Sequence, residues 1–165
     1  MSSSLLQTLN SYPVSFYFQL SFPGVDAAFQ EVSGISKELG IEEVVSGGEN
    51  RFKWKLPTIT TSQNLVLKRA LVPVGSPLIA WASATMDTGL SLGIRTLPVM
   101  LSLLDISGMV YQMWVFHDAY PVKYSVSEFK SQESGIVIES LELAYTYFDI
   151  SIVTATAVRA AEAML

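Results

Sequence analysis

The sequence contains no cysteine and a single histidine among its 165 residues. The absence of cysteine excludes a disulfide framework and a thiolate metal site. A metal centre or a hydrolase would need further imidazoles, clustered carboxylates, or a nucleophile with a partner base, and the sequence offers no such set. His117 is therefore interpreted as a structural histidine near a strand end, with Asp118 pointing to the opposite face of that strand.

Charged residues are also scarce, at 15% of the chain against about 25% in an average globular protein, whereas hydrophobic residues reach 50%. A soluble monomer needs charge on its outside, so this composition indicates that much of the surface is buried against other copies. A membrane protein is the competing explanation, but no stretch approaches the roughly 20 apolar residues of a spanning helix. The net charge of −5 disfavours a nucleic-acid-binding surface.

Motifs that would indicate an enzyme are incomplete. Gly47-Gly48 is not followed by the lysine and Ser/Thr of a phosphate loop, and Asp87-Thr88-Gly89 occurs once and follows a predicted helix. Met100, Met109 and Met113 fall in predicted strands and are expected in the core. No signal peptide is predicted at the start of the chain, so synthesis in the cytoplasm is expected. We predict a protein that is not an enzyme and has no cofactor, metal or catalytic residue.

Alternating apolar and polar residues predict a mainly β fold. The clearest strand, Val14–Phe22, has a second face that is neutral and polar, which indicates a subunit contact or a lumen. Ser76 followed by Pro77 predicts the start of one helix over Leu78–Met86. About seven strands and one helix favour two packed antiparallel sheets that form a sandwich or partial barrel. Other predicted strands include Phe29–Glu38, Leu97–Leu103, Met109–His117 and Ile136–Phe148.

The stretch Glu42–Leu71 is the most informative part of the chain. Phe52–Leu56 alternates as a half-buried strand, which Pro57 is expected to end because it lacks a backbone N–H. Thr58–Asn64 is then a polar turn, and Leu65–Leu71 a return strand. A loop with acidic residues precedes this basic strand. An acidic loop beside a basic strand suits a protruding arm that docks on another copy of the chain. A solvated surface hairpin is the alternative that the pattern leaves open.

The order of these elements resembles the tail-tube family of contractile phages and extracellular contractile injection systems, and more distantly the haemolysin-coregulated tube proteins. The resemblance is strongest to the tubes of particles such as the anti-feeding prophage, and it covers Val14 to Tyr147. Its carriers are the following segments: Phe29–Gly34, Gly47–Arg51, Leu56-Pro57 with Leu65–Arg69, Trp114–Phe116, Ala119–Lys123 and Ile138–Leu143.

The resemblance implies a structural subunit that forms homohexameric rings with a continuous inner β-barrel. The rings would stack into a hollow conduit, which sheath contraction propels to deliver protein cargo. Implied partners are the sheath protein, the baseplate or spike hub and a tube terminator, with nucleic acid only in a phage tail. The particle would assemble in the bacterial cytoplasm and stay there or be released, as a virion if it is a phage. The expected organisation is an N-terminal arm over 1–13, a tail-tube-like domain over 14–148 and a C-terminal tail over 149–165.

Two sets of residues are expected to carry assembly. The resemblance assigns inter-ring stacking to the acidic loop: Glu42, Glu43, Val44, Val45, Ser46, Gly47, Gly48, Glu49, Asn50 and Arg51. Aromatic residues are expected in the core or between subunits: Phe16, Phe18, Trp54, Trp114 and Tyr145. The alternative function is a monomeric β-sandwich binding module, which would need a deep pocket with a few converging polar groups.

Trp54→Ala tests the placement of the central strand. If Trp54 is buried in a core strand, its loss costs about 3–5 kcal/mol and lowers the soluble yield. An unchanged melting temperature would instead place the indole at the surface.

Overall fold

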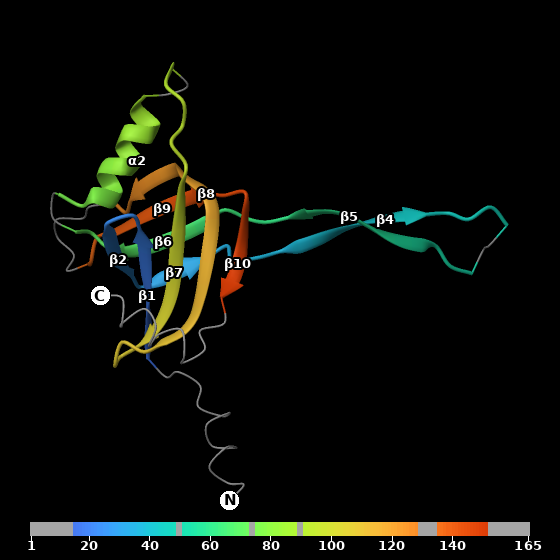
Figure 1. Cartoon of the computed structure of the whole chain (residues 1–165), viewed down its shortest axis with the longest axis horizontal. Coiled ribbons are helices and arrows are strands. Elements are labelled where there is room, and N and C mark those ends of the chain that lie inside the picture. Colours follow the sequence, from blue (N-terminus) through green and yellow to red (C-terminus); the bar gives the residue numbers. More distant parts are fainter. Residues whose placement is uncertain (1–14, 49–50, 73–74, 89–90, 129–134, 152–165) are drawn as a thin grey trace, which may run out of the picture.

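The computed structural model describes residues 15–48, 51–72, 75–88, 91–128 and 135–151. Figure 1 shows a β-rich body with a long two-stranded arm on one side and a helix on the other. The mainly β fold with one helix is thereby confirmed for this part of the chain. Its elements are β1 (Phe16–Phe22), β2 (Val25–Phe29), β3 (Glu31–Ser33), β4 (Glu38–Val44), β5 (Trp54–Thr61), β6 (Leu65–Ala70), α2 (Pro77–Asp87), β7 (Leu97–Asp105), β8 (Val110–Val126), β9 (Ile138–Ala144) and β10 (Tyr147–Ser151).

The body is one antiparallel sheet that curls into a partly closed barrel. Its strand order is β2-β1-β7-β8-β9-β6-β3, and β10 also pairs with β8. The sheet closes because β2 and β3 follow each other directly in the chain. β2 pairs with β1 at one end of the order, and β3 pairs with β6 at the other. Between them, the Gln30 N–H donates to the Lys68 carbonyl at 3.0 Å.

Two long bent strands connect the halves of the barrel. β8 runs through Pro121, which we expected to be a kink after a shorter strand, and it bends where Asp118 has a positive φ of 54°. β9 and β10 lie along one edge of β8 and share a register across the bend, and the β8–β9 pairing shifts only between Pro121 and Lys123. The Thr146 N–H bridges β9 and β10 by donating to the His117 carbonyl at 3.0 Å. The single strand predicted over Ile136–Phe148 is thus divided by this bend.

The segment before the arm also differs from the expectation. The predicted strand Phe29–Glu38 is broken, because β3 ends at Ser33 and Gly34 adopts a φ of 88°.

The chain then forms β4 and returns as β5, which continues through Pro57 to Thr61 instead of ending there. A proline is tolerated because β4 and β5 form an isolated pair, so β5 is an edge strand that needs no N–H on its outer side.

The core lies between the inner faces of the curled sheet. On one side Leu20 of β1 is paired with Leu101 of β7, and on the other Leu67 of β6 is paired with Leu141 of β9. All four are buried, as alternation on a half-buried sheet requires. Phe116 is completely buried and contacts the rings of Tyr145 and Phe148, with centroids 4.8 and 5.3 Å away.

Helix α2 begins and ends close to its predicted bounds. Ser76 is the N-cap residue and Pro77 occupies the first turn, as expected. Leu78 and Ala82 form the buried side of the helix, and Trp81 stacks on Phe22 at 5.6 Å. Within the described ranges, no helix is long and apolar enough to cross a membrane.

Gly34→Ala is expected to destabilise the base of the arm. A Cβ at this position would lie 1.9 Å from the Asn64 carbonyl oxygen, in a backbone conformation that only glycine adopts easily. We expect the free energy of unfolding in urea to fall by about 1–3 kcal/mol or more. Gly47→Ala is the control, because a Cβ there meets nothing within 4 Å. Equal stability of both variants would contradict the close approach at Gly34.

Candidate assembly surfaces

The arm is a β-ribbon without a core of its own. β4 and β5 pair only with each other, from Glu38 opposite Thr61 to Val44 opposite Trp54. Every residue of β5 is exposed, and the ribbon extends well away from the body in Figure 1. Two-stranded ribbons are at best marginally stable in water. The arm is therefore held by its base at Gly34 and Asn64 and by whatever covers it.

Both faces of the arm carry large apolar side chains. Residues paired directly across an antiparallel ribbon share a face, so Val44, Trp54 and Leu56 lie on one side. Leu39, Ile41 and Pro57 lie on the other. Trp54 is 55% exposed and Ile41 is 63% exposed. A solvated hairpin would place polar residues on at least one face, so this pattern favours contacts with other molecules on both faces.

The predicted acidic loop is partly strand. Glu42 and Glu43 lie in β4, opposite Leu56 and Lys55, so they are not loop residues as expected. Glu43 already accepts a contact from Lys53 within the chain at 3.3 Å, and an exposed pair of this kind contributes about 0–1 kcal/mol. The tip follows at Val45, Ser46, Gly47 and Gly48, all exposed, as is Arg51; Glu49 and Asn50 lie outside the described residues.

The predicted aromatic set is divided by the structure. Phe18, Trp114 and Tyr145 are partly buried and pack against the core. Phe16 is 51% exposed at the start of β1, with its ring edge-on to Phe18 at 5.8 Å. The expectation that Trp54 is a core residue is wrong within one chain, because its strand belongs to the arm. An inter-subunit position for Phe16 and Trp54 stays a prediction.

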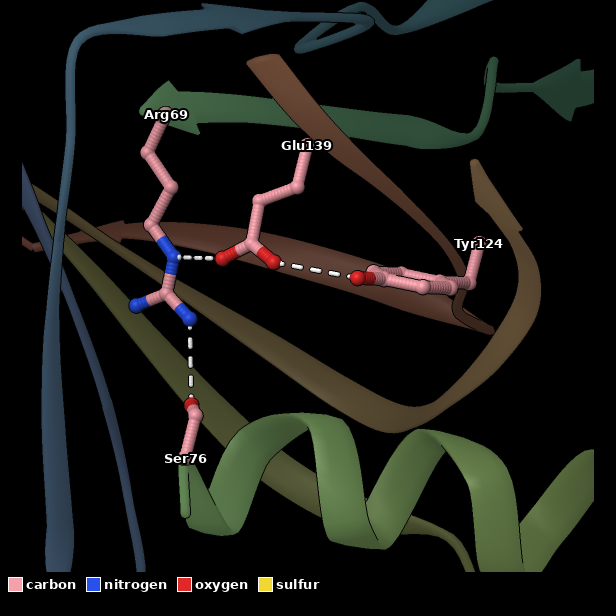
Figure 2. Close-up of polar contacts among 4 residues, drawn as sticks. All are labelled: Arg69, Ser76, Tyr124 and Glu139. Atoms are coloured by element: carbon pink, nitrogen blue, oxygen red, sulfur yellow. Dashed lines mark hydrogen bonds and ion pairs between the residues drawn. The ribbon is translucent and has the colours of Figure 1, made fainter. Parts of the chain in front are cut away.

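A buried ion pair lies at the opposite side of the body from the arm. Figure 2 shows the Arg69 guanidinium of β6 bonded through Nε to Glu139 of β9, directly opposite it in the sheet. The two residues are 8% and 3% exposed. A terminal nitrogen of Arg69 donates to the Ser76 hydroxyl at 3.0 Å, and Tyr124 donates to the second Glu139 oxygen at 3.1 Å. These bonds connect α2 to the barrel, and the Ser76 hydroxyl is used here instead of capping the helix.

The surroundings of this pair hold it in position. Burial and the hydrogen bond to Glu139 raise the pKa of Tyr124, so the phenol remains a donor at neutral pH. The Arg69 guanidinium also lies over the Phe29 ring, 5.1 Å from its centroid. We did not predict this cluster from the sequence. The sequence did contain a signal for it, because alternation along the strand places Arg69 on the same inward face as Leu65 and Leu67.

Two adjoining hollows border the ion pair and α2. The larger has a volume of about 520 Å³ and a mostly apolar lining that includes Leu71, Val72, Ile79 and Ala80, with Tyr124 and Glu139 as polar groups. The smaller, of about 390 Å³, is lined by Arg69, Asp26, Pro77 and neighbours. They share Val72, Gly75 and Ser76. We call the two together the α2 groove.

The outward face of the sheet β2-β1-β7-β8-β10 carries no Lys or Arg at its paired positions. Its titratable groups besides tyrosine are Asp26, His117 and Asp149. His117 contacts Asp149 at 3.0 Å and stacks on Tyr147 at 4.2 Å, so it links β8 to β10. The remaining outward residues include Tyr17, Gln19, Ser21, Met100, Ser102 and Met113.

Comparison with known proteins gives a family and a set of similar structures. Residues 14–149 match the family described as T4-like virus tail tube protein gp19. A chain in the cryo-EM structure of the anti-feeding prophage (AFP) baseplate is 24% identical, with a TM-score of 0.73 over 87% of this chain and 99% of that one. A chain of the extended PVC sheath–tube complex, an extracellular contractile injection system, is 19% identical, with a TM-score of 0.74 over 93% and 99%.

A more distant structure, Hcp1 from Flavobacterium johnsoniae, is 16% identical, with a TM-score of 0.54 over 82% of this chain and 94% of that one. Comparison with curated proteins by sequence finds no match.

Glu139→Gln is expected to leave the buried Arg69 without a counter-charge. Breaking a buried ion pair at one partner typically costs about 3–5 kcal/mol, measured as the free energy of unfolding in urea. Glu31→Gln is the matched control, since Glu31 forms an exposed pair with Lys68, next to Arg69, at 2.6 Å. Its loss is expected to cost only about 0–1 kcal/mol. Similar losses of stability for the two variants would show that the Arg69 charge does not depend on Glu139 for compensation.

Trp54→Ala is now expected to leave the melting temperature of the isolated subunit nearly unchanged, because surface substitutions usually cost less than about 0.5 kcal/mol. Phe116→Ala, at a fully buried ring, should lose about 3–5 kcal/mol in the same assay. A loss of that size for Trp54→Ala would mean that the arm folds back onto the body in solution.

Proposed function

Since the chain belongs to the family of T4-like virus tail tube proteins and is a structural subunit of a tube, we propose that it forms hexameric rings that stack into a hollow conduit. The main support for this proposal is the apolar arm, because nothing in the described part of the chain packs against its two exposed faces. The conduit acts mechanically, without catalysis by this subunit. A six-fold symmetrised baseplate contains a chain of this fold, which supports six copies in a ring.

Strand edges supply the contacts within a ring. In the described part of the chain β10 pairs on one side only, with β8, and its outer backbone groups are available for a neighbouring copy. Joining sheets edge to edge would make the outward face of β2-β1-β7-β8-β10 continuous around the ring. We propose that this face lines the lumen, since its neutral polar surface suits the passage of cargo without tight binding.

The arm supplies the contact between rings. A head-to-tail contact that does not close on itself generates an open filament, and a long arm on one side of the body is suited to such a contact. The residues proposed to stack rings are Glu42–Arg51 at the end of the arm. Trp54 and Phe16 are proposed to be buried between subunits, because each is large, apolar and about half exposed in the single chain.

The wider particle follows from the same proposal. The extended PVC complex contains a sheath together with a tube chain of this fold, and the AFP and PVC terminator structures contain similar chains. We propose that this subunit likewise lies inside a contractile sheath, between a baseplate and a terminator, in a phage-tail-like particle. Contraction would then drive the tube and its protein cargo into a target.

A monomeric binding module is the second candidate, and the α2 groove is the observation that favours it. The groove has a few polar groups at one end of a mostly apolar lining. It does not account for the arm, however, whose exposed apolar residues would be a liability on a monomer. The tube subunit therefore remains the better explanation.

Deletion of Val45–Asn50 removes the tip of the arm and is expected to stop assembly at rings. The subunit should still fold and form rings, because none of the described residues of the tip lies in the core, but long tubes should disappear from negative-stain images. Gly47→Ala keeps the length of the tip and should assemble like the unaltered chain. Tubes of normal length from the deleted protein would contradict stacking by the arm.

A further inference from the structure

We propose that the α2 groove of each subunit receives the arm of a second copy, with Trp54 as the anchoring side chain. The inference rests on the proposed function and identifies the surface that the arm contacts.

The first argument is position. Figure 1 shows α2 and the chain leading into it on the side of the body opposite the arm. Most residues that line the larger hollow lie between Leu71 and Ser83 and belong to these two segments, and strands of the barrel supply the rest. In a head-to-tail stack, the arm of one copy points toward this side of the next copy. The contact is heterologous, so repeating it yields an open filament and not a closed dimer.

The second argument is shape and chemistry. The larger hollow has a volume of about 520 Å³. Pockets that bind small molecules typically have volumes of about 300–1,000 Å³, so the hollow is large enough for a tryptophan side chain. Leu71, Val72 and Ile79 provide an apolar wall, and the Tyr124 hydroxyl and Glu139 lie at its polar end. An indole has the matching character, with a large apolar ring and one N–H donor. Trp54 is the tryptophan that the arm presents.

The third argument is charge. Glu42 lies opposite Leu56, on the same face of the arm as Trp54 and about 7–8 Å from it along the diagonal. The adjoining hollow is lined by Arg69, whose guanidinium is fixed by Glu139 and Ser76. Glu139 already compensates the Arg69 charge, so a carboxylate entering there would gain a hydrogen bond from a guanidinium held in a fixed position and little net charge attraction. Asp26 also lines this hollow, but it is exposed, so solvent screens its charge.

A disulfide test identifies the contact directly, because the natural chain has no cysteine. Val44→Cys places a thiol beside Trp54 on the arm, and Ala80→Cys places one at the exposed rim of the groove. Oxidation of assembled tubes of the double variant should give a ladder of linked multimers on a non-reducing gel, which reductant abolishes. Val44→Cys with Met86→Cys is the control, since Met86 is exposed on α2 but does not line the groove.

A steric test uses the same two positions. Ala80→Arg fills the rim of the groove and should reduce tube length at least tenfold while rings persist. Met86→Arg, with the same added charge, should form tubes of normal length. The circular dichroism of both variants should match that of the unaltered chain, since both sites are exposed.

The outcomes separate this inference from the function on which it rests. Rings without tubes for the tip deletion, together with normal tubes for Ala80→Arg and no disulfide ladder, would overturn the groove as receptor while leaving stacking by the arm intact. Tubes from the tip deletion would overturn both. Linked dimers without higher multimers would also contradict the proposal, because a head-to-tail contact links each copy to the next.

Discussion

The fold depends on one long backbone pairing, between β8 and the run of β9 and β10. This pairing keeps a single register across the bend at Asp118, with the Thr146–His117 hydrogen bond bridging the break. It carries β8 from the half of the barrel that contains β1 and β7 to the half that contains β6. Phe116, Tyr145 and Phe148 fill the inside of this bend. β7, which follows α2, lies on one side of this pairing, and β6, which follows the arm, lies on the other.

The scarcity of charge and the shape of the molecule have the same physical origin. A chain with 15% charged residues cannot cover an isolated surface with well-solvated groups. The structure places much of the exposed apolar surface on the arm, where both faces hold large side chains. Such a ribbon gains stability only when another molecule covers it. The arm of the subunit therefore depends on assembly for its stability, and the composition of the sequence is the cause.

The ion pair of Arg69 and Glu139 serves geometry more than stability. Buried pairs seldom contribute much net free energy, because desolvation offsets the attraction. Here the pair occupies positions in the inward rows of β6 and β9 where leucines otherwise lie. It joins the start of α2 to the barrel through Ser76 and orients Tyr124 at the same time. The walls of the α2 groove are thereby held in fixed relation, as a surface that receives a partner requires.

The sequence by itself determined the fold class and the helix, and it predicted an arm, but as a loop instead of a two-stranded ribbon. Alternation marks strands because half-buried sheets require it, and Ser76-Pro77 marks the helix start because of its local backbone geometry. Only the tertiary structure decided that Trp54 is exposed, that β5 passes through Pro57 and that Arg69 meets Glu139. Periodicity shows that a strand has two different faces, but not which layer covers each face. That depends on pairing between residues as far apart in the chain as Phe16 and Asp105, which no local pattern encodes.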